Sequence, residues 1–258
     1  FNGSSKDKGK AFMDLYKNPK IKAIFDISGG DLANEVLDYL DYEFIAKNPK
    51  PIFGYSDLTT VLNSVYSQTN NSVYLYQIRN LIYSDSKNQL TNFSNSLLTD
   101  TNDLFNFSYK FIQGESLSGI TVGGNIRCLL KLAGTKYMPD FTDKILFLEE
   151  FWLESPPEAV SSYFYRMKQN DVFSKIKGIW LGGYEHESGI TLAQVLKDTI
   201  GNEYDFPIIQ SDNNISPTIE ELLVKVIDNP NLPIAKTEDI GHGSTSKCLI
   251  IGKNIILN

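Results

Sequence analysis

A serine stands where a predicted strand passes into a predicted helix. In KPIFGYSDLTTVLNSVY, residues 50–66, a short apolar run ends in Gly-Tyr-Ser-Asp, and apolar residues then recur with helical spacing. Ser56 is therefore expected on a tight turn, beside N–H groups of a helix N-terminus that could stabilise the oxyanion of acyl transfer. The turn departs from the Gly-x-Ser-x-Gly form of a nucleophile elbow. A serine that only caps the helix is the alternative interpretation.

A nucleophilic serine needs a base, and the chain has two histidines. His242 lies in DIGHGS, after the predicted strand LPIAK, between glycines that let the backbone approach closely. His186 lies in the charged loop GGYEHESG, where a solvated side chain is the expected outcome. These positions favour His242 as the base.

The third member of such a site is a carboxylate that orients the imidazole. Glu149 ends the apolar run KILFLE, and a carboxylate at the carboxyl end of a buried strand is a stronger candidate than one on a helix surface. Its neighbour Glu150 is the alternative, which strand alternation would direct to the opposite face.

Short β-rich runs alternate with longer helical ones, a pattern typical of parallel sheets whose strands are joined by helices. We expect an α/β fold, with an N-terminal parallel-sheet domain that carries the strand-Ser-helix elbow between flanking helices, followed by a C-terminal α/β domain. The first domain would span 1–80, an Asn- and Ser-rich linker 81–118, and the second domain 119–258. Sites in open α/β sheets gather at the carboxyl ends of strands, where the candidate residues fall.

The periodicity also predicts individual elements. In the first domain, we expect a strand over 21–27 that runs into a helix over 31–40, and a second strand that ends before a helix starting near Asp57. In the second domain, the expected strands are 144–150 and 176–184, and the expected helix is 156–169. Two similar helix-strand units then follow, 190–213 and 215–239, which suggests a local duplication.

Composition narrows the function classes. The formal charge of -7 comes from interspersed acids without a basic stripe, which argues against nucleic acid and polybasic membrane partners. Cys128 and Cys248 lie far apart, so neither a disulfide framework nor a zinc site is expected, and a reducing cytoplasmic location fits. No apolar run reaches the roughly 18 residues of a membrane helix, and the first residues do not resemble a signal peptide.

Three motifs occur in a fixed order along the chain. They are FDISGGDLANEVLDYLDYEFIAKNPKPIFGYSDLT at 25–59, GITVGGNIRCLLKLAGTKYMPDFTDKILFLEE at 119–150, and IGHG at 240–243. Together they resemble the LD-carboxypeptidase family of serine peptidases, which includes the microcin C immunity peptidases. The likeness covers most of residues 3–151 outside the Asn-rich middle, and two shorter regions nearer the C-terminus.

The resemblance implies a hydrolase that works through a Ser-His-Glu triad and an acyl-enzyme. The family's serine, histidine and glutamate match Ser56, His242 and Glu149. The implied fold places the serine in a first domain, and the other two residues in a second α/β domain. No metal or cofactor is implied.

The resemblance also implies an oxyanion hole. Gly29 and Gly30 match the family's paired glycines, and the amide of Asp57, which follows the serine, would complete the hole.

Two substrate classes follow from the resemblance. Members of the family either remove the terminal D-alanine of murein tetrapeptides or cut the amide between an aspartyl group and a modified nucleotide. The sequence of these motifs resembles the immunity branch more closely, because the Tyr-Arg-x-Asp-Arg run of murein enzymes is missing. Trp152 could stack on a base or sugar, although packing is the alternative role. The expected partner is a small peptide or aminoacyl nucleotide, and a homodimer is common in the family.

The chain departs from the family pattern in several places. It begins inside the family's first domain, it has no recognisable Tyr- or His-Gly-Pro segment after the first helices, and an extra α-β unit precedes IGHG. The alternatives to a complete enzyme are a fragment, an enzyme completed by a partner, and a degenerate homologue that acts as a binding module.

Overall fold

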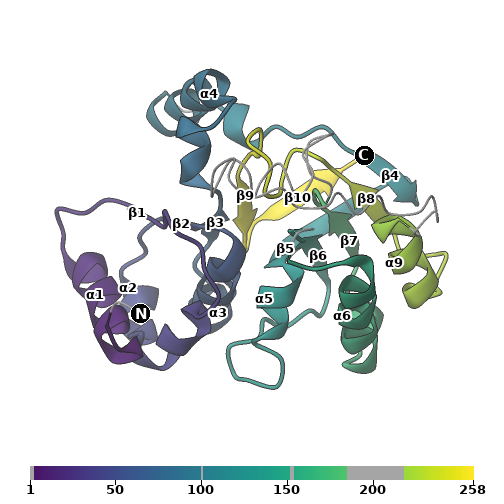
Figure 1. Ribbon diagram of the computed structural model, residues 1–258, viewed down its shortest axis with the longest axis horizontal. Coiled ribbons are helices and arrows are strands. Elements are labelled where there is room, and N and C mark those ends of the chain that lie inside the picture. The colour runs from purple at the N-terminus through teal and green to yellow at the C-terminus, as the bar shows by residue number, and fades with distance from the viewer. Residues whose placement is uncertain (1–2, 100, 152–153, 185–217) are drawn as a thin grey trace, which may run out of the picture.

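Two sheets lie side by side, and each contains one of the last two strands of the chain (Figure 1). The computed structural model describes residues 3–99, 101–151, 154–184 and 218–258. The first sheet has the order β1-β2-β3-β9, and the second has the order β10-β5-β6-β7-β8-β4. The two consecutive strands β9 and β10 thus belong to different sheets and tie them together.

The first sheet is built mainly from the N-terminal part of the chain. Strands β1 to β3 run parallel, and β9 pairs antiparallel with β3. The strands are β1 Ile24–Phe25, β2 Ile52–Gly54, β3 Val73–Leu75 and β9 Leu249–Ile251. The helices of this part are α1 Ser5–Lys17, the 3-10 helix η1 Ala33–Tyr39, α2 Tyr42–Lys47, the 3-10 helix η2 Ser56–Leu58 and α3 Thr59–Thr69.

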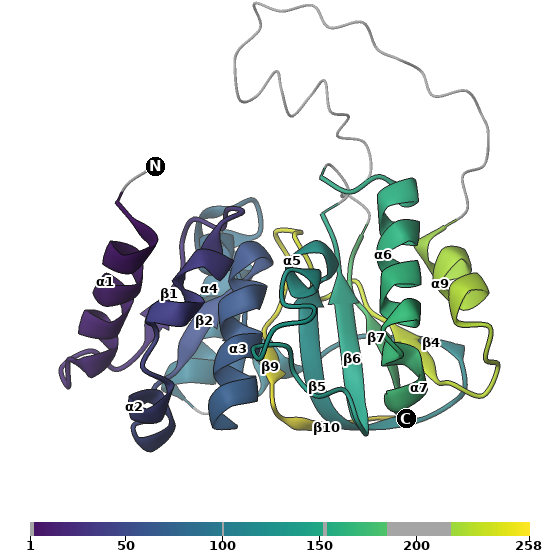
Figure 2. The same ribbon diagram turned by 90° about the horizontal axis from the view of Figure 1, so that it is seen from below.

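The second sheet has a parallel centre of β5, β6, β7 and β8 with antiparallel edge strands. Its strands are β4 Lys110–Gln113, β5 Leu117–Asn125, β6 Lys144–Glu149, β7 Gly178–Leu181, β8 Ile234–Lys236 and β10 Asn254–Leu257. Its helices are α5 Ile126–Leu130, α6 Pro157–Gln169, α7 Val172–Lys175 and α9 Ile219–Ile227. Figure 2 shows α6 and α9 side by side next to the strands.

A third group of elements lies between the two sheets in sequence. These are the 3-10 helix η3 Ile78–Ile82, α4 Ser86–Leu98 and the 3-10 helix η4 Asp103–Phe105. The segment expected as a linker, 81–118, therefore contains α4 and also supplies the edge strand β4 to the second sheet. The expected division into domains stays a prediction.

Local sequence explains where the main helices begin. In α9, the Thr218 hydroxyl accepts from the Glu221 N–H, and the Glu221 carboxylate accepts from the Thr218 N–H, which forms a capping box. Helix α6 starts at Pro157, where the missing N–H is not needed. Strand β6 is apolar on both faces because it is buried between neighbouring strands and helices, as expected for a central parallel strand.

Helix α3 joins the two sheets and is buried along most of its length. The Asn63 amide group donates to the Gly123 carbonyl (2.8 Å), and its carbonyl oxygen accepts from the Gly123 N–H (3.0 Å). A Cβ at Gly123 would lie 2.0 Å from the Phe147 carbonyl oxygen, so only glycine fits there. The Asn125 N–H donates to Thr59 Oγ1 (3.0 Å). These contacts hold the end of β5 against the start of α3, beside Ser56.

The α/β fold with parallel sheets is confirmed. The strand expected over 21–27 pairs only over β1, and the helix expected over 31–40 is the 3-10 helix η1. The first of the two similar units, 190–213, lies outside the described residues, so the suggested duplication stays a prediction. Both cysteines are buried free thiols. Within the described ranges, every helix is too short or too polar to cross a bilayer.

Candidate active site

Ser56 lies on a strained turn directly after β2. Its φ of +51° is in the left-handed region, which residues other than glycine rarely adopt. Glycine is required at position 54, two residues before the serine, because a Cβ on Gly54 would lie 2.7 Å from Leu58 Cβ. Such strain is typical of a serine presented by a strand-to-helix turn, and it persists only where the surroundings enforce it.

The interpretation of Ser56 as a helix N-cap is wrong. The flanking residue of η2 is Tyr55, that of α3 is Leu58, and neither helix has a side-chain cap hydrogen bond. Among the described residues, the Ser56 hydroxyl has no hydrogen-bond partner, and the residue is 8% exposed. The side chain is thus placed by the turn and remains available for chemistry.

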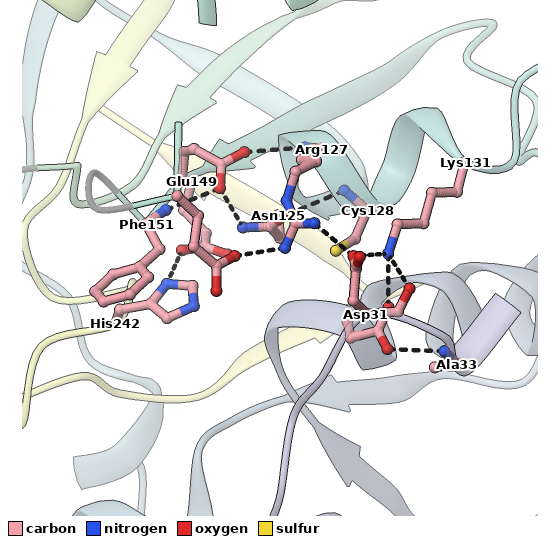
Figure 3. Close-up of polar contacts among 12 residues, drawn as sticks. Asp31, Ala33, Asn125, Arg127, Cys128, Lys131, Glu149, Phe151 and His242 are labelled. Atoms are coloured by element: carbon pink, nitrogen blue, oxygen red, sulfur yellow. Dashed lines mark hydrogen bonds and ion pairs between the residues drawn. The ribbon is translucent and has the colours of Figure 1, made fainter. Parts of the chain in front are cut away.

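Glu149 and His242 meet at the carboxyl end of the second sheet (Figure 3). His242 Nδ1 lies 2.7 Å from Glu149 Oε2, and the carboxylate is almost fully buried. Glycine at 182 makes room for this carboxylate, because a Cβ there would lie 2.9 Å from Glu149 Cβ. Since the carboxylate accepts the hydrogen bond, Nδ1 carries the proton and Nε2 is left as the basic nitrogen.

Electrostatics favour a charged imidazole in this pair. Burial lowers the pKa of His242, but the charge and hydrogen bond of Glu149, together with the charges of Glu150 and Glu154, outweigh burial, and the net pKa lies above its ordinary value of 6.5. A raised pKa strengthens the histidine as an acceptor of the serine proton.

Aromatic rings hold the imidazole in place. The Phe151 ring stacks on it with centroids 4.9 Å apart, and the Tyr55 ring meets it edge-on at 5.6 Å. Because Tyr55 precedes Ser56, the serine turn and the histidine are neighbours. In the described part of the chain, no hydrogen bond joins Ser56 to His242. Catalytic hydrogen bonds often shorten only when substrate binds.

The alternative carboxylate points elsewhere. Glu150 is buried and accepts from the Asn125 side-chain amide (2.8 Å) and from the N–H groups of Arg127 (3.0 Å) and Phe151 (2.9 Å). Burial and the neighbouring Glu149 raise the pKa of this carboxyl group. Glu150 therefore faces the start of α5, and Glu149 is the carboxylate that pairs with His242.

The paired glycines form a loop over Asp57. Both have positive φ, +61° at Gly29 and +141° at Gly30. The Gly29 N–H donates to Asp26 Oδ2 (2.9 Å), whereas the Gly30 N–H has no partner among the described residues. Gly30 is therefore the better placed donor of the two, and Gly29 supplies the backbone turn that presents it.

Charged residues that the sequence analysis did not single out surround this loop. Arg127 pairs with Asp31 and Glu154, and Lys131 pairs with Asp31 and Asp57 (Figure 3). The four-residue spacing of the two cations in GGNIRCLLK, which puts them on one helix face, was the available signal.

Two residues named from the sequence cannot be placed. Trp152 and His186 lie outside the described residues. Among the described residues, no group of three or more His, Cys, Asp or Glu side chains is arranged to bind a metal ion.

Comparison with known proteins gives the family. The model of the LD-carboxypeptidase N-terminal domain matches residues 1–76, and that of the LD-carboxypeptidase C-terminal domain matches residues 118–257. The chain is 24% identical over 293 residues to the microcin C7 self-immunity protein MccF of Escherichia coli, covering all of this chain and 77% of the relative. It is also 24% identical over 203 residues to the "Probable murein peptide carboxypeptidase" of Bacillus subtilis (strain 168), covering 72% of this chain and 61% of the relative.

Solved structures agree with this result. A structure of MccF in complex with glutamyl sulfamoyl guanosine matches with a TM-score of 0.75 and 22% identity, over 98% of this chain and 78% of that one. The muramoyltetrapeptide carboxypeptidase from Oxalobacter formigenes matches with a TM-score of 0.72 and 20% identity, over 99% of this chain and 81% of that one. At these identities the likeness establishes the fold. Because the two family models together match most of its length, the chain belongs to the LD-carboxypeptidase family of peptidases and is a hydrolase.

Proposed function

We propose that Ser56, His242 and Glu149 form the catalytic triad of a serine peptidase or amidase that cuts an amide bond through an acyl-enzyme. The observation that carries this proposal is the buried 2.7 Å contact between His242 Nδ1 and Glu149, beside a serine held on a strained turn. This is the arrangement of base and orienting group that activates a nucleophilic hydroxyl.

In the first half-reaction, Ser56 Oγ attacks the carbonyl carbon of the amide while His242 Nε2 takes the hydroxyl proton. The imidazolium that forms is stabilised by Glu149. The oxyanion of the tetrahedral intermediate accepts hydrogen bonds from the N–H groups of Gly30 and Asp57. When the C–N bond breaks, His242 passes its proton to the leaving amine and an ester to Ser56 remains.

In the second half-reaction, water replaces the amine. His242 takes a proton from the water, the hydroxide attacks the ester carbonyl, and Ser56 leaves as the alcohol after receiving the proton. The product is a free carboxylic acid, and the enzyme returns to its starting state without a metal or cofactor.

We propose an amide of an acidic aminoacyl nucleotide as the first substrate to test, and a murein tetrapeptide as the second. The first is supported by the similarity to MccF, whose solved structure is described as a complex with glutamyl sulfamoyl guanosine. The second is supported by the likeness to murein peptide and muramoyltetrapeptide carboxypeptidases. Trp152 is proposed as a stacking residue for a base or sugar.

The test is hydrolysis of the two substrates under identical conditions, followed by mass spectrometry. The protein is compared with Ser56→Ala, and with Glu43→Gln as a control for an exposed carboxylate remote from the site. Turnover of one substrate that Ser56→Ala loses and Glu43→Gln keeps supports the proposal. Tight binding of either substrate without turnover would instead identify a binding module.

The location and assembly of the protein are also proposals. The two free, buried thiols favour a reducing compartment such as the cytoplasm. A homodimer is proposed from the family resemblance, and light scattering at several protein concentrations would measure it.

A further inference from the structure

One ammonium group contacts both segments that carry the proposed oxyanion donors. Lys131 Nζ donates to the Asp31 carbonyl oxygen (2.7 Å), to Asp31 Oδ1 (2.6 Å) and to Asp57 Oδ1 (3.0 Å). Asp31 directly follows Gly30, and Asp57 directly follows Ser56. We refer to Lys131, Asp31 and Asp57 as the Lys131 bridge, part of which is drawn in Figure 3.

The Lys131 bridge is protected from water at its centre. The side chain of Lys131 is 19% exposed and that of Asp57 is 3% exposed. Burial opposes the charge on Lys131, but the hydrogen bonds to Asp31 and Asp57 outweigh it and raise the pKa of the ammonium group. The ammonium group is therefore charged at neutral pH, and its ion pair with the buried Asp57 is screened less than its pair with Asp31, whose side chain is 62% exposed.

The second oxygen of Asp57 completes the connection. Asp57 Oδ2 accepts from the Ala33 N–H (2.7 Å), at the start of η1 and three residues after Gly30. The Asp57 carboxylate is thus held by the glycine segment on one side and by Lys131 on the other. Because both carboxylate oxygens are bound, the Asp57 side chain anchors the backbone of the residue whose own N–H is a proposed oxyanion donor.

We propose that Lys131 is a positioning residue that sets the spacing between the Gly30 and Asp57 N–H donors of the oxyanion hole. This inference rests on the proposed function. Lys131 follows α5, which packs on the second sheet, whereas both donors belong to segments around the first sheet, so Lys131 acts through Asp31 and Asp57 without touching the substrate. Oxyanion stabilisation requires donors that are already in place, and the bridge supplies that order.

Arg127 is a useful comparison, because it also links α5 to Asp31 but is not paired with Asp57. Its guanidinium group pairs with Glu154 as well. A bridge that only stabilises the fold would lose stability equally with either cation. A positioning role instead requires that the contact to Asp57 govern turnover.

The experiment compares Lys131→Met and Lys131→Arg with the unchanged protein, using the substrate that the protein hydrolyses. Removal of one oxyanion donor lowers kcat by about 100- to 1,000-fold, and displaced donors are expected to lower it by about 30-fold in Lys131→Met. We expect KM to change less than about threefold and Lys131→Arg to recover part of kcat. The acid limb of the pH profile should not move, because Lys131 does not contact His242. Lys17→Met, which breaks an exposed ion pair, should keep full activity.

Asp57→Asn gives a second test should Lys131→Met fail to fold. It keeps the backbone N–H but removes the charge that Lys131 binds, so kcat should fall while KM is retained. Unchanged kcat in folded Lys131→Met or in Asp57→Asn, with the unchanged protein active, would overturn the positioning role alone. An unchanged protein that hydrolyses neither substrate would refute the proposed function, and the positioning role with it.

Discussion

Replacing Glu149 by Gln tests the His242–Glu149 pair in the most detail. The substitution keeps the size of the side chain but removes the charge that lies 2.7 Å from His242 Nδ1. A hydrogen bond to a charged group contributes about 1.5–3 kcal/mol, and about 1.4 kcal/mol corresponds to a tenfold change in rate. Lost stabilisation of the imidazolium alone therefore predicts a decrease of roughly 10- to 150-fold in kcat/KM.

The loss should be larger because the glutamine side chain of this variant could also donate through its amide group. In that orientation it would favour a proton on Nε2, which cannot then accept the serine proton. In a Ser-His-Asp enzyme, the corresponding carboxylate-to-amide change lowers kcat by about 10,000-fold. We therefore expect Glu149→Gln to lower kcat/KM by at least about 100-fold.

The pH profile gives a second, independent readout. His242 must be neutral to take the serine proton, and Glu149 raises its pKa above the ordinary 6.5. Activity of the unchanged protein should thus rise through a pH above 6.5, and Glu149→Gln should move this rise to lower pH. The assay is kcat/KM from about pH 5 to 9, with Glu43→Gln as the matched control. An unmoved acid limb, or a loss below about tenfold, would refute the reasoning.

Three further predictions concern stability. Ser56→Gly should raise the free energy of unfolding by about 1 kcal/mol, because glycine adopts φ +51° without strain. Urea titrations measure this change, and an unchanged unfolding midpoint would argue against stored strain at Ser56. Asn63→Ala should lower it by about 2–3 kcal/mol, since both Gly123 backbone groups lose their buried partner, and a loss under about 0.5 kcal/mol would contradict this. For His242, the raised folded pKa means that its charged form stabilises the fold fully below pH 6.5, and this contribution disappears as pH rises through the folded value. The stability difference between the protein and His242→Ala should therefore be larger at about pH 5.5 than at about pH 9, and the reverse order would be inconsistent with the pair.

The residues found from sequence share one property. Glu149 ends β6, and Ser56 and His242 follow β2 and β8, so each candidate lies at or beyond the carboxyl end of a strand in one of the two sheets. Short windows of sequence can reveal strand ends, which is why these candidates could be proposed from the sequence.

The remaining features depend on contacts between distant segments. Lys131 lies 100 residues from Asp31 in sequence, and the helical spacing of Lys131 and Arg127 indicates a shared face but not the partner that this face binds. The helix expected over 31–40 forms a 3-10 helix whose first N–H is bound by the side chain of Asp57, 24 residues away. Helical periodicity could reveal an apolar face there, but not the type of helix that the partner imposes.

The most direct test of the central claim is the intact mass after reaction with a fluorophosphonate probe. The account predicts a single adduct, mapped to Ser56, that is absent from Ser56→Ala and from folded His242→Ala. A folded protein that forms no adduct, or one that carries the adduct on another residue, would contradict the claim that Ser56 is an activated nucleophile.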